Sequence, residues 1–258
     1  MLVIRLARLL LVCVFAVVVQ TAHAGEKITL AAASDLKFAL DEIVVLFNKT
    51  HPADRVETVY GSSGKFQAQI RQGAPFDLYF SADISYPRAL KAEGFAASEV
   101  QPYAVGRIVL WSPLLDASKM TLADLADPSI RKIAIANPKH APYGKRAEEA
   151  LRAAGVWGEV ESRLVYGENI AQTAQFVQSG NVSVGVIALS LALNPELAKR
   201  GGHALIPGNL HRPLEQGFII TQHAAGNPLA QAFARFMTGN EARTIMHRYG
   251  FVLPDKVE

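Results

Sequence analysis

Short apolar runs alternate along the chain with segments whose apolar residues recur at helical spacing. The runs that predict strands lie at 28–32, 55–59, 78–80, 132–136, 162–166 and 182–188. The segments that predict helices after the first five runs lie at 36–50, 66–70, 84–92, 145–154 and 169–179. Two more predicted helices close the chain, at 228–237 and 241–248. Repeated strand-then-helix units are typical of parallel sheets with helices on their faces, so we expect an α/β protein.

Two further runs, 103–111 and 214–220, are rich in β-forming residues and carry a central glycine, Gly106 or Gly217. One run leads out of the first set of strand-helix units and the other returns before the closing helices. They therefore predict two lobes with a ligand cleft between them, each a mostly parallel sheet flanked by helices, formed by residues 25–104 plus 216–258 and by residues 105–215. The two glycines are candidate hinges, and β-bulges are the alternative explanation.

The first 24 residues predict a secretory signal peptide. Arg5 and Arg8 give a basic start, residues 9–19 are apolar, and Ala22-His23-Ala24 is a small-x-small cleavage site. A membrane anchor is the weaker alternative, because the apolar run is well short of the roughly 20 residues that a membrane-spanning helix needs. We therefore expect cleavage after Ala24 and secretion of a mature chain that begins at Gly25.

Charge and cysteine content exclude several kinds of function. The chain has 26 Lys and Arg against 23 Asp and Glu, a formal charge of +3, to which Arg5 and Arg8 contribute two units. No basic run is present, so nucleic acid is not an expected partner. The only cysteine, Cys13, lies in the predicted signal peptide, which excludes disulfides and thiolate metal sites from the mature chain. The histidines show no metal-ligand spacing on a helix, so we expect neither a cofactor nor a directly coordinated metal ion.

Two serine-bearing turns connect a predicted strand to a predicted helix. Ser34 follows the strand at 28–32, and Gly61-Ser62-Ser63-Gly64 follows the strand at 55–59. A helix start carries unpaired N–H groups and the positive end of the helix dipole, which together favour an anion. Helix capping, worth about 1 kcal/mol, explains either serine taken alone. Two such turns at the ends of neighbouring strands favour a shared anion site.

Enzyme motifs are incomplete around these turns. Residues 61–64 do not form the G-x-S-x-G nucleophile elbow, and Phe66 stands where a P-loop needs Ser or Thr. A secreted serine hydrolase that uses Ser63 is a remote alternative, and it requires a base within hydrogen-bond reach. Uncharged donors suit a fully deprotonated oxyanion. A protonated phosphate also needs an acceptor, and Asp35 keeps that ligand open.

A set of short motifs covers nearly the whole chain after residue 24 in a fixed order: Ala31-Ala32-Ala33-Ser34, Gly61-Ser62-Ser63-Gly64, Gly73-Ala74-Pro75-Phe76-Asp77-Leu78, Ser81-Ala82-Asp83, Ala136-Asn137-Pro138, Ala141-Pro142-Tyr143-Gly144 and Tyr249-Gly250-Phe251. The ordered set resembles the periplasmic molybdate-binding proteins of ABC transporters. The resemblance implies the two-lobed type II periplasmic-binding-protein fold. It also implies a monomeric binding protein that is not an enzyme. Such a protein captures molybdate, and often also tungstate, and delivers the anion to a membrane permease. Sulfate or another tetrahedral oxyanion is the alternative ligand.

The resemblance also implies which residues hold the oxyanion. Carried over by position, Ser34 and Ser63 contribute hydroxyl and amide groups from the first lobe. Tyr143 and Ile170 contribute amides from the second lobe. Asp35 contributes only its amide, because its carboxylate would repel a dianion and is expected to turn away. These residues contact the metal only in the sense that molybdate contains molybdenum.

Two positions differ from the common pattern of that family. Many members carry a tyrosine whose hydroxyl reaches the anion, and Ala188 stands at that position here. Tyr143 stands where many members have a small residue. Its hydroxyl either replaces the missing donor or simply lines the cleft. The turn residue His140 is expected to be a solvated loop side chain or to lie at the cleft rim.

Overall fold

The computed structural model describes residues 25–254. The predicted signal peptide and its cleavage site lie outside the described residues. Within the described part, no helix is long and apolar enough to cross a membrane.

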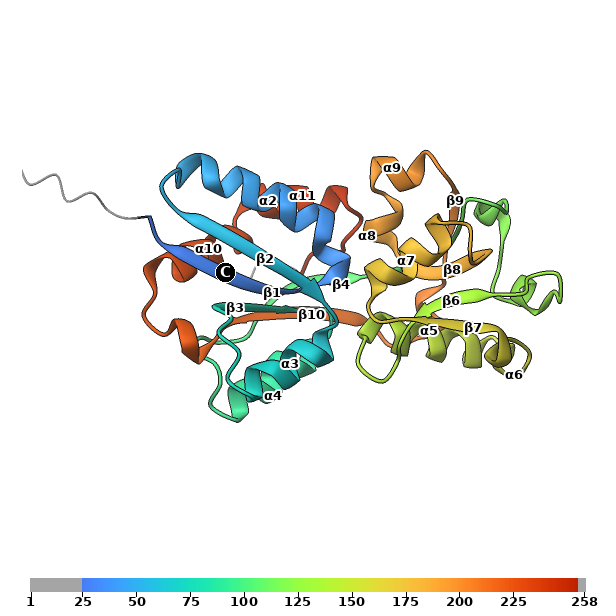
Figure 1. Cartoon of the computed structure of the whole chain (residues 1–258), viewed down its shortest axis with the longest axis horizontal. Helices are drawn as coiled ribbons and strands as arrows, with labels where there is room; N and C mark the ends of the chain where they lie inside the picture. The colour runs from blue at the N-terminus through green and yellow to red at the C-terminus, as the bar shows by residue number, and fades with distance from the viewer. Residues whose placement is uncertain (1–24, 255–258) are drawn as a thin grey trace, which may run out of the picture.

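The chain forms two lobes side by side, each built on a five-stranded sheet (Figure 1). The first sheet contains, in spatial order, β2 (Arg55–Gly61), β1 (Lys27–Ala33), β3 (Leu78–Ser81), β10 (Leu214–Ile220) and β4 (Gln101–Gly106). The second contains β7 (Leu164–Gly167), β6 (Ile133–Ala136), β8 (Val184–Ala188), β5 (Ile108–Ser112) and β9 (Gly202–Leu205). In each sheet the first three strands run parallel and the last two join antiparallel. The expected two-lobed α/β architecture is confirmed.

Helices cover both faces of each sheet (Figure 1). The first lobe carries α2 (Lys37–Thr50), α10 (Pro228–Thr238) and α11 (Asn240–Arg248) on one face, and α3 (Ser63–Arg71) and α4 (Ser85–Ala92) on the other. The second lobe carries α5 (Pro142–Ala153) and α6 (Trp157–Val160) opposite α7 (Ile170–Gln178), α8 (Leu189–Ala192) and α9 (Pro195–Ala198). Short 3-10 helices are η1 (Ser34–Leu36), η2 (Ala117–Lys119), η3 (Ala123–Ala126), η4 (Glu161–Arg163), η5 (Gly208–Leu210) and η6 (Gln222–Ala224).

The period of two in the strands divides the core of the first lobe between the two faces of its sheet. Leu30 of β1 belongs to the buried cluster that contains Phe47 of α2 and Phe233 of α10. Its neighbour Ala31 belongs to the cluster on the other face, with Phe66 of α3. Because both faces are covered there, the inner strands β1 and β3 are apolar at most positions, which is why the sequence shows them as apolar runs.

The predicted strand-helix units form with boundaries shifted by a few residues. The helix expected at 145–154 begins three residues earlier, since Pro142 occupies the first helical position, where its fixed φ angle is favourable. The run at 103–111, expected as one strand, forms two: β4 ends at Gly106 in the first sheet and β5 begins at Ile108 in the second. β9 was not expected, because its four residues show no apolar alternation.

The single residue between β4 and β5 is Arg107, and it marks where the chain passes from one sheet to the other. Its guanidinium donates to the carbonyl of Gly250 from Nε at 3.0 Å and from Nη2 at 2.6 Å. The crossing point is therefore tied to the C-terminal part of the chain. The lobe boundaries at 104/105 and 215/216 stay a prediction.

Close packing accounts for both central glycines. A Cβ atom on Gly217 would lie 2.6 Å from Cγ1 of Ile84, and the pairing of β10 with β4 shifts register between Gln216 and Gly217. A Cβ atom on Gly106 would lie 2.3 Å from the hydroxyl of Tyr143. The register shift agrees with the irregularity expected as the alternative at Gly217. A hinge role for either glycine stays a prediction.

Replacement of Gly217 by alanine should destabilise the fold, because the added methyl group overpacks against Ile84. We expect Gly217→Ala to lower the free energy of unfolding by about 1–3 kcal/mol, measured by urea denaturation. The matched control is Gly158→Ala, at an exposed position of helix α6 where an added Cβ meets nothing within 4 Å. That control should be neutral or slightly stabilising. Equal stability of the two variants would contradict the packing explanation.

Candidate functional site

A small pocket lies at the junction of the two lobes. Its walls come from residues 33–35, 61–63 and 82 of the first lobe and from residues 141–143 and 170 of the second. The first-lobe segments follow the carboxyl ends of β1, β2 and β3, where open α/β sheets bind ligands. The pocket brings together all five residues predicted to bind the oxyanion: Ser34, Asp35, Ser63, Tyr143 and Ile170.

Three α-helices begin at this pocket. Ser63 is the first residue of α3, Tyr143 is the second residue of α5, and Ile170 is the first residue of α7. The first N–H groups of a helix have no intrahelical acceptor, and the helix dipole places positive charge at the same end. Helix starts from both lobes therefore face one small space, which favours an anion there.

Ser34 links the two lobes through its side chain. Its Oγ donates to Oδ1 of Asn169 at 3.1 Å and accepts from the N–H of Ala171 at 3.2 Å. The N-cap of η1 is Ala33, and no side chain caps that turn. The capping explanation for Ser34 is therefore wrong: its hydroxyl lies at the start of α7 rather than capping its own helix.

Ser63 is also not a helix cap. The N-cap of α3 is Ser62, whose side chain makes no capping bond. The Oγ of Ser63 accepts from the N–H of Ala82 at 3.0 Å, and the Ser63 side chain is fully buried. Because Oγ accepts in this contact, the hydroxyl hydrogen of Ser63 is left to donate to a ligand. The N–H of Gly64 next to it donates across the lobe junction to the carbonyl of His140 at 2.9 Å.

Tyr143 directs its hydroxyl into a buried hydrogen-bond network. The hydroxyl donates to Oδ2 of Asp35 at 3.0 Å and accepts from Nε2 of Gln216 at 3.1 Å. Burial, followed by the charge of Asp35, raises the pKa of Tyr143 well above its usual value, so the hydroxyl keeps its proton. Since this donor is used by Asp35, the structure does not support its use as a replacement for the tyrosine missing at Ala188. Ala188 ends β8 and is not part of the pocket wall.

Asp35 is buried, with 1% exposure, and only one of its two carboxyl oxygens forms a hydrogen bond in the described structure. Its Oδ2 accepts from Tyr143 and, at 2.8 Å, from Nε2 of Gln216, whereas its Oδ1 has no hydrogen-bond partner in the described structure. Burial raises the pKa of this carboxyl to about 7, while Gln216, Tyr143 and the nearby main-chain N–H groups of Asp35 and Leu36 act in the opposite direction. The carboxyl group is directed at Tyr143 and Gln216, and Asp35 is one of the residues that line the pocket.

The start of α7 is organised by Asn169. This N-cap residue accepts from the N–H of Gln172 at 3.0 Å, and the N–H of Ala171 donates to Ser34. The N–H of Ile170 takes part in neither of these two hydrogen bonds, and the Ile170 side chain is buried. The Gly-Glu-Asn-Ile segment gives a recognisable N-cap signal. No local sequence signal predicts the contact of Asn169 with Ser34, which lies 135 residues away.

Contacts at the rim of the pocket join the lobes. Nδ1 of His140 lies 3.0 Å from Oγ of Ser62, and Nε2 of His140 lies 3.6 Å from Oε1 of Glu168. Lys65 forms an ion pair with the same carboxylate. Partial burial lowers the pKa of His140 below its usual value, partly opposed by Glu168. His140 therefore lies at the cleft rim and is not a freely solvated loop residue.

The hydrolase alternative lacks its base. In the described structure no imidazole or carboxylate is hydrogen-bonded to Oγ of Ser63, and His140 contacts Ser62 instead. Residues 25–254 also contain no group of three or more His, Cys, Asp or Glu side chains that could hold a metal ion.

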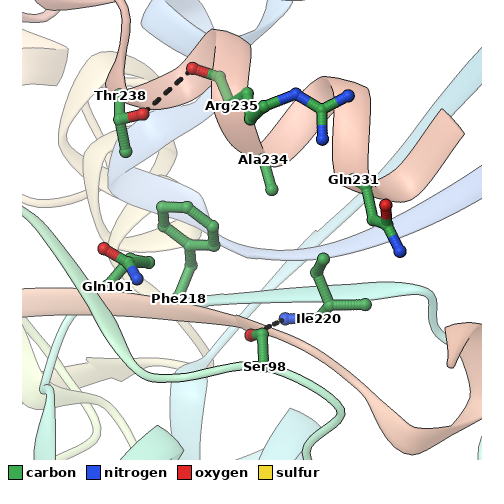
Figure 2. Close-up of a pocket in the computed structure, with 8 residues that line it drawn as sticks. All are labelled: Ser98, Gln101, Phe218, Ile220, Gln231, Ala234, Arg235 and Thr238. Carbon is green, nitrogen blue, oxygen red and sulfur yellow. Dashed lines mark hydrogen bonds between the residues drawn. The ribbon is translucent and has the colours of Figure 1, made fainter. Parts of the chain in front are cut away.

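A second pocket lies within the first lobe, between α10 and the strands β4 and β10 (Figure 2). Phe218 and Ile220 form part of its wall, and Arg235 is its only charged residue. The N–H of Ile220 donates to Oγ of Ser98 at 2.9 Å. This pocket contains none of the predicted binding residues and has no contribution from the second lobe, so it is not the candidate site.

Comparisons with known proteins give consistent results. A family model described as bacterial extracellular solute-binding protein matches residues 28–252. The molybdate-binding protein ModA of Azotobacter vinelandii is 34% identical over 245 residues, covering 95% of this chain and 97% of that protein. ModA of Rhodobacter capsulatus is 36% identical over 234 residues, covering 90% of each.

Solved structures show the same fold. The periplasmic molybdate-binding protein of Azotobacter vinelandii matches with a TM-score of 0.83 at 31% identity, covering 88% of this chain and 100% of that one. The sulfate-binding protein SubI of Mycobacterium tuberculosis matches with a TM-score of 0.71 over 89% of this chain and 88% of that one. Its 17% identity supports a shared fold only.

Removal of the Ser63 hydroxyl should cost stability even without a ligand, because it leaves the buried N–H of Ala82 without an acceptor. We expect Ser63→Ala to lower the free energy of unfolding by about 1–3 kcal/mol in chemical denaturation. Ser129→Ala, at an exposed loop position, is the matched control and should leave the free energy within about 0.5 kcal/mol of the wild type. If both variants are as stable as the wild type, the contact between Ser63 and Ala82 is not formed in solution.

Proposed function

The chain belongs to the family of bacterial extracellular solute-binding proteins, and we propose that it binds molybdate, and also tungstate, in the periplasm and delivers the anion to the permease of an ABC transporter. The relatives named for molybdate binding, at 34% and 36% identity over most of the chain, support this choice of ligand. The proposed protein is a carrier without catalytic activity and without a cofactor.

One observation carries the proposal: the pocket at the lobe junction presents only uncharged hydrogen-bond donors and a single buried carboxyl group. A fully deprotonated oxyanion accepts hydrogen bonds at every oxygen and offers none. Hydroxyl and main-chain N–H groups satisfy such an anion without burying a counter-charge, which would carry its own desolvation cost. The proposed donors are the hydroxyl of Ser63, the hydroxyl of Ser34 once its hydrogen turns from Oδ1 of Asn169 to the anion, and the main-chain N–H groups of Asp35, Tyr143 and Ile170.

Selectivity in such a site comes from the number and spacing of donors. A buried donor that finds no acceptor costs about 1–3 kcal/mol, so an anion of the wrong size loses affinity even at equal charge. Sulfate and other tetrahedral oxyanions have the same charge pattern and are the alternative ligands. A shared fold with a sulfate-binding protein at 17% identity does not favour that alternative.

Lobe closure completes the site, because donors from both lobes are required at once. The contacts of Ser34 with α7 and of Gly64 with His140 are of the kind that forms when the lobes meet. We propose that closure traps the anion and that the closed form is the one presented to the permease. Since a single chain supplies every donor, the proposed functional unit is a monomer.

Calorimetric titration of residues 25–258 with molybdate, tungstate, sulfate and phosphate tests the ligand. We expect one tight site for molybdate and tungstate, and much weaker binding of sulfate. Preference for sulfate or phosphate would keep the site but change the substrate, and silence with all four anions would contradict the proposal.

Ser34→Ala tests the placement of the site in the same titration. A hydrogen bond to a charged group is worth about 1.5–3 kcal/mol, so the variant should bind molybdate roughly 10- to 150-fold more weakly. Lys65→Met controls for loss of a contact between the lobes, since it removes the exposed ion pair with Glu168 outside the pocket. The control should change affinity by about fivefold at most. Equal effects of the two variants would place the anion elsewhere.

A further inference from the structure

Asp35 is the one acidic residue among those that line the lobe-junction pocket, and its surroundings allow its carboxyl group to do more than repel a bound anion. Its carboxyl group is buried between the lobes, with Oδ2 held by Tyr143 and Gln216 and Oδ1 without a partner. A buried carboxyl oxygen without a partner is costly, and either a proton or a ligand donor satisfies it.

The groups that face Asp35 are neutral on every side. Tyr143 of α5 donates to the carboxylate, and Gln216 of β10 does the same. Tyr103 of β4 donates to Oε1 of Gln216 at 2.7 Å, and Ser190 of α8 donates to the Asp35 carbonyl at 2.7 Å. The titratable groups around the carboxyl are therefore the two tyrosines, and burial raises the pKa of both well above the neutral range.

No cation in the described structure contacts this carboxyl. The basic side chains on neighbouring elements are used elsewhere: Lys37 pairs with Asp41, the Arg107 guanidinium donates to the carbonyl of Gly250, and Arg146 pairs with Asp83 and Glu149. The charge state of Asp35 is therefore set by burial and by what occupies the pocket.

An ionised Asp35 beside a bound dianion would be a buried like-charge pair without a counter-ion, which is strongly unfavourable. A protonated Asp35 reverses the interaction, because a carboxylic acid has an O–H donor and retains acceptor capacity. Oδ2 can keep accepting from Tyr143 and Gln216 while Oδ1 carries the hydrogen. Since burial already raises the pKa of Asp35 to about 7, protonation near neutral pH costs little free energy.

We propose that Asp35 contacts the oxyanion as a neutral carboxylic acid whose Oδ1–H donates a hydrogen bond to it, so that each molybdate bound above neutral pH takes up one proton from solvent. The reaction balances as carboxylate plus proton plus dianion giving the carboxylic acid bonded to the dianion, with no other bond made or broken. This inference rests on the proposed function and deepens it: Asp35 becomes a specificity-determining residue of the same site.

The assignment separates two classes of oxyanion. Molybdate, tungstate and sulfate are fully deprotonated at neutral pH, so the shared proton must come from solvent. Hydrogen phosphate brings its own proton and can donate it to an ionised Asp35. Affinity for the first class should therefore fall as pH rises, whereas hydrogen phosphate should bind without net proton uptake.

The sign and size of the pH effect follow from linkage. Bound dianion raises the pKa of Asp35 further, so the bound form holds a proton that the free form loses as pH rises above about 7. Affinity for molybdate should be nearly constant below that pH. Above it, affinity should fall by up to roughly tenfold per pH unit until the carboxyl of the complex itself ionises.

Calorimetric titration of residues 25–258 with molybdate, at about pH 8 and in two buffers of different ionisation enthalpy, measures the proton directly. We expect an uptake close to one proton per molybdate in the wild type, and an affinity about tenfold weaker at about pH 9 than at about pH 8. Asp35→Asn should take up no proton and should bind equally at both pH values, because the amide is a permanent neutral donor. Asp41→Asn, at a half-exposed acid on α2, is the matched control and should behave as the wild type.

The outcomes separate this inference from the proposed function. Molybdate binding by the wild type without proton uptake, or an unchanged pH dependence in Asp35→Asn, overturns the role of Asp35 and leaves the proposed function standing. Absence of binding to any oxyanion by the wild type overturns both. The wild-type proton count decides the question even if Asp35→Asn does not fold.

Discussion

The N–H groups at the start of an α-helix have no intrahelical acceptor, and this fold directs three such helix starts at one small pocket. α3 comes from the first lobe, and α5 and α7 come from the second. In the proposed site neither lobe alone would satisfy an anion, since each supplies only part of the donor set. The strands bring these helix starts together, because the carboxyl ends of β1, β2 and β3 face those of β6 and β7 across the lobe junction.

The buried network behind the pocket connects binding to the crossing strands. Gln216 of β10 holds Asp35, Tyr143 and Tyr103 together, so that groups from both lobes share one set of hydrogen bonds. Gly106, the last residue of β4, leaves the space that the Tyr143 hydroxyl occupies. The ends of the crossing strands β4 and β10 are therefore in contact with the hydrogen-bond network that holds Asp35.

Local patterns in the sequence were enough to predict most of the fold and the residues that line the pocket at the lobe junction. The apolar runs predicted the strands because both faces of each sheet are buried. Ser34 and Ser63 were found because each follows a strand and precedes a helix. The division of 103–111 into two strands was missed, since Arg107 carries no local signal of a change of sheet. The hydrogen bonds of Gln216 were missed because its partners lie far away in the chain, as with the 181 residues between Asp35 and Gln216. Such contacts arise only from tertiary packing.

The most direct test of the central claim is to locate the anion. Crystals of residues 25–258 grown with tungstate would allow the tungsten atom to be found by its anomalous scattering. We expect one strong peak at the lobe junction, with tungstate oxygens about 2.7–3.2 Å from the hydroxyls of Ser34 and Ser63 and from the N–H of Ile170. A peak outside that junction, for example in the pocket beside α10, or no ordered tungsten at saturating tungstate, would contradict it.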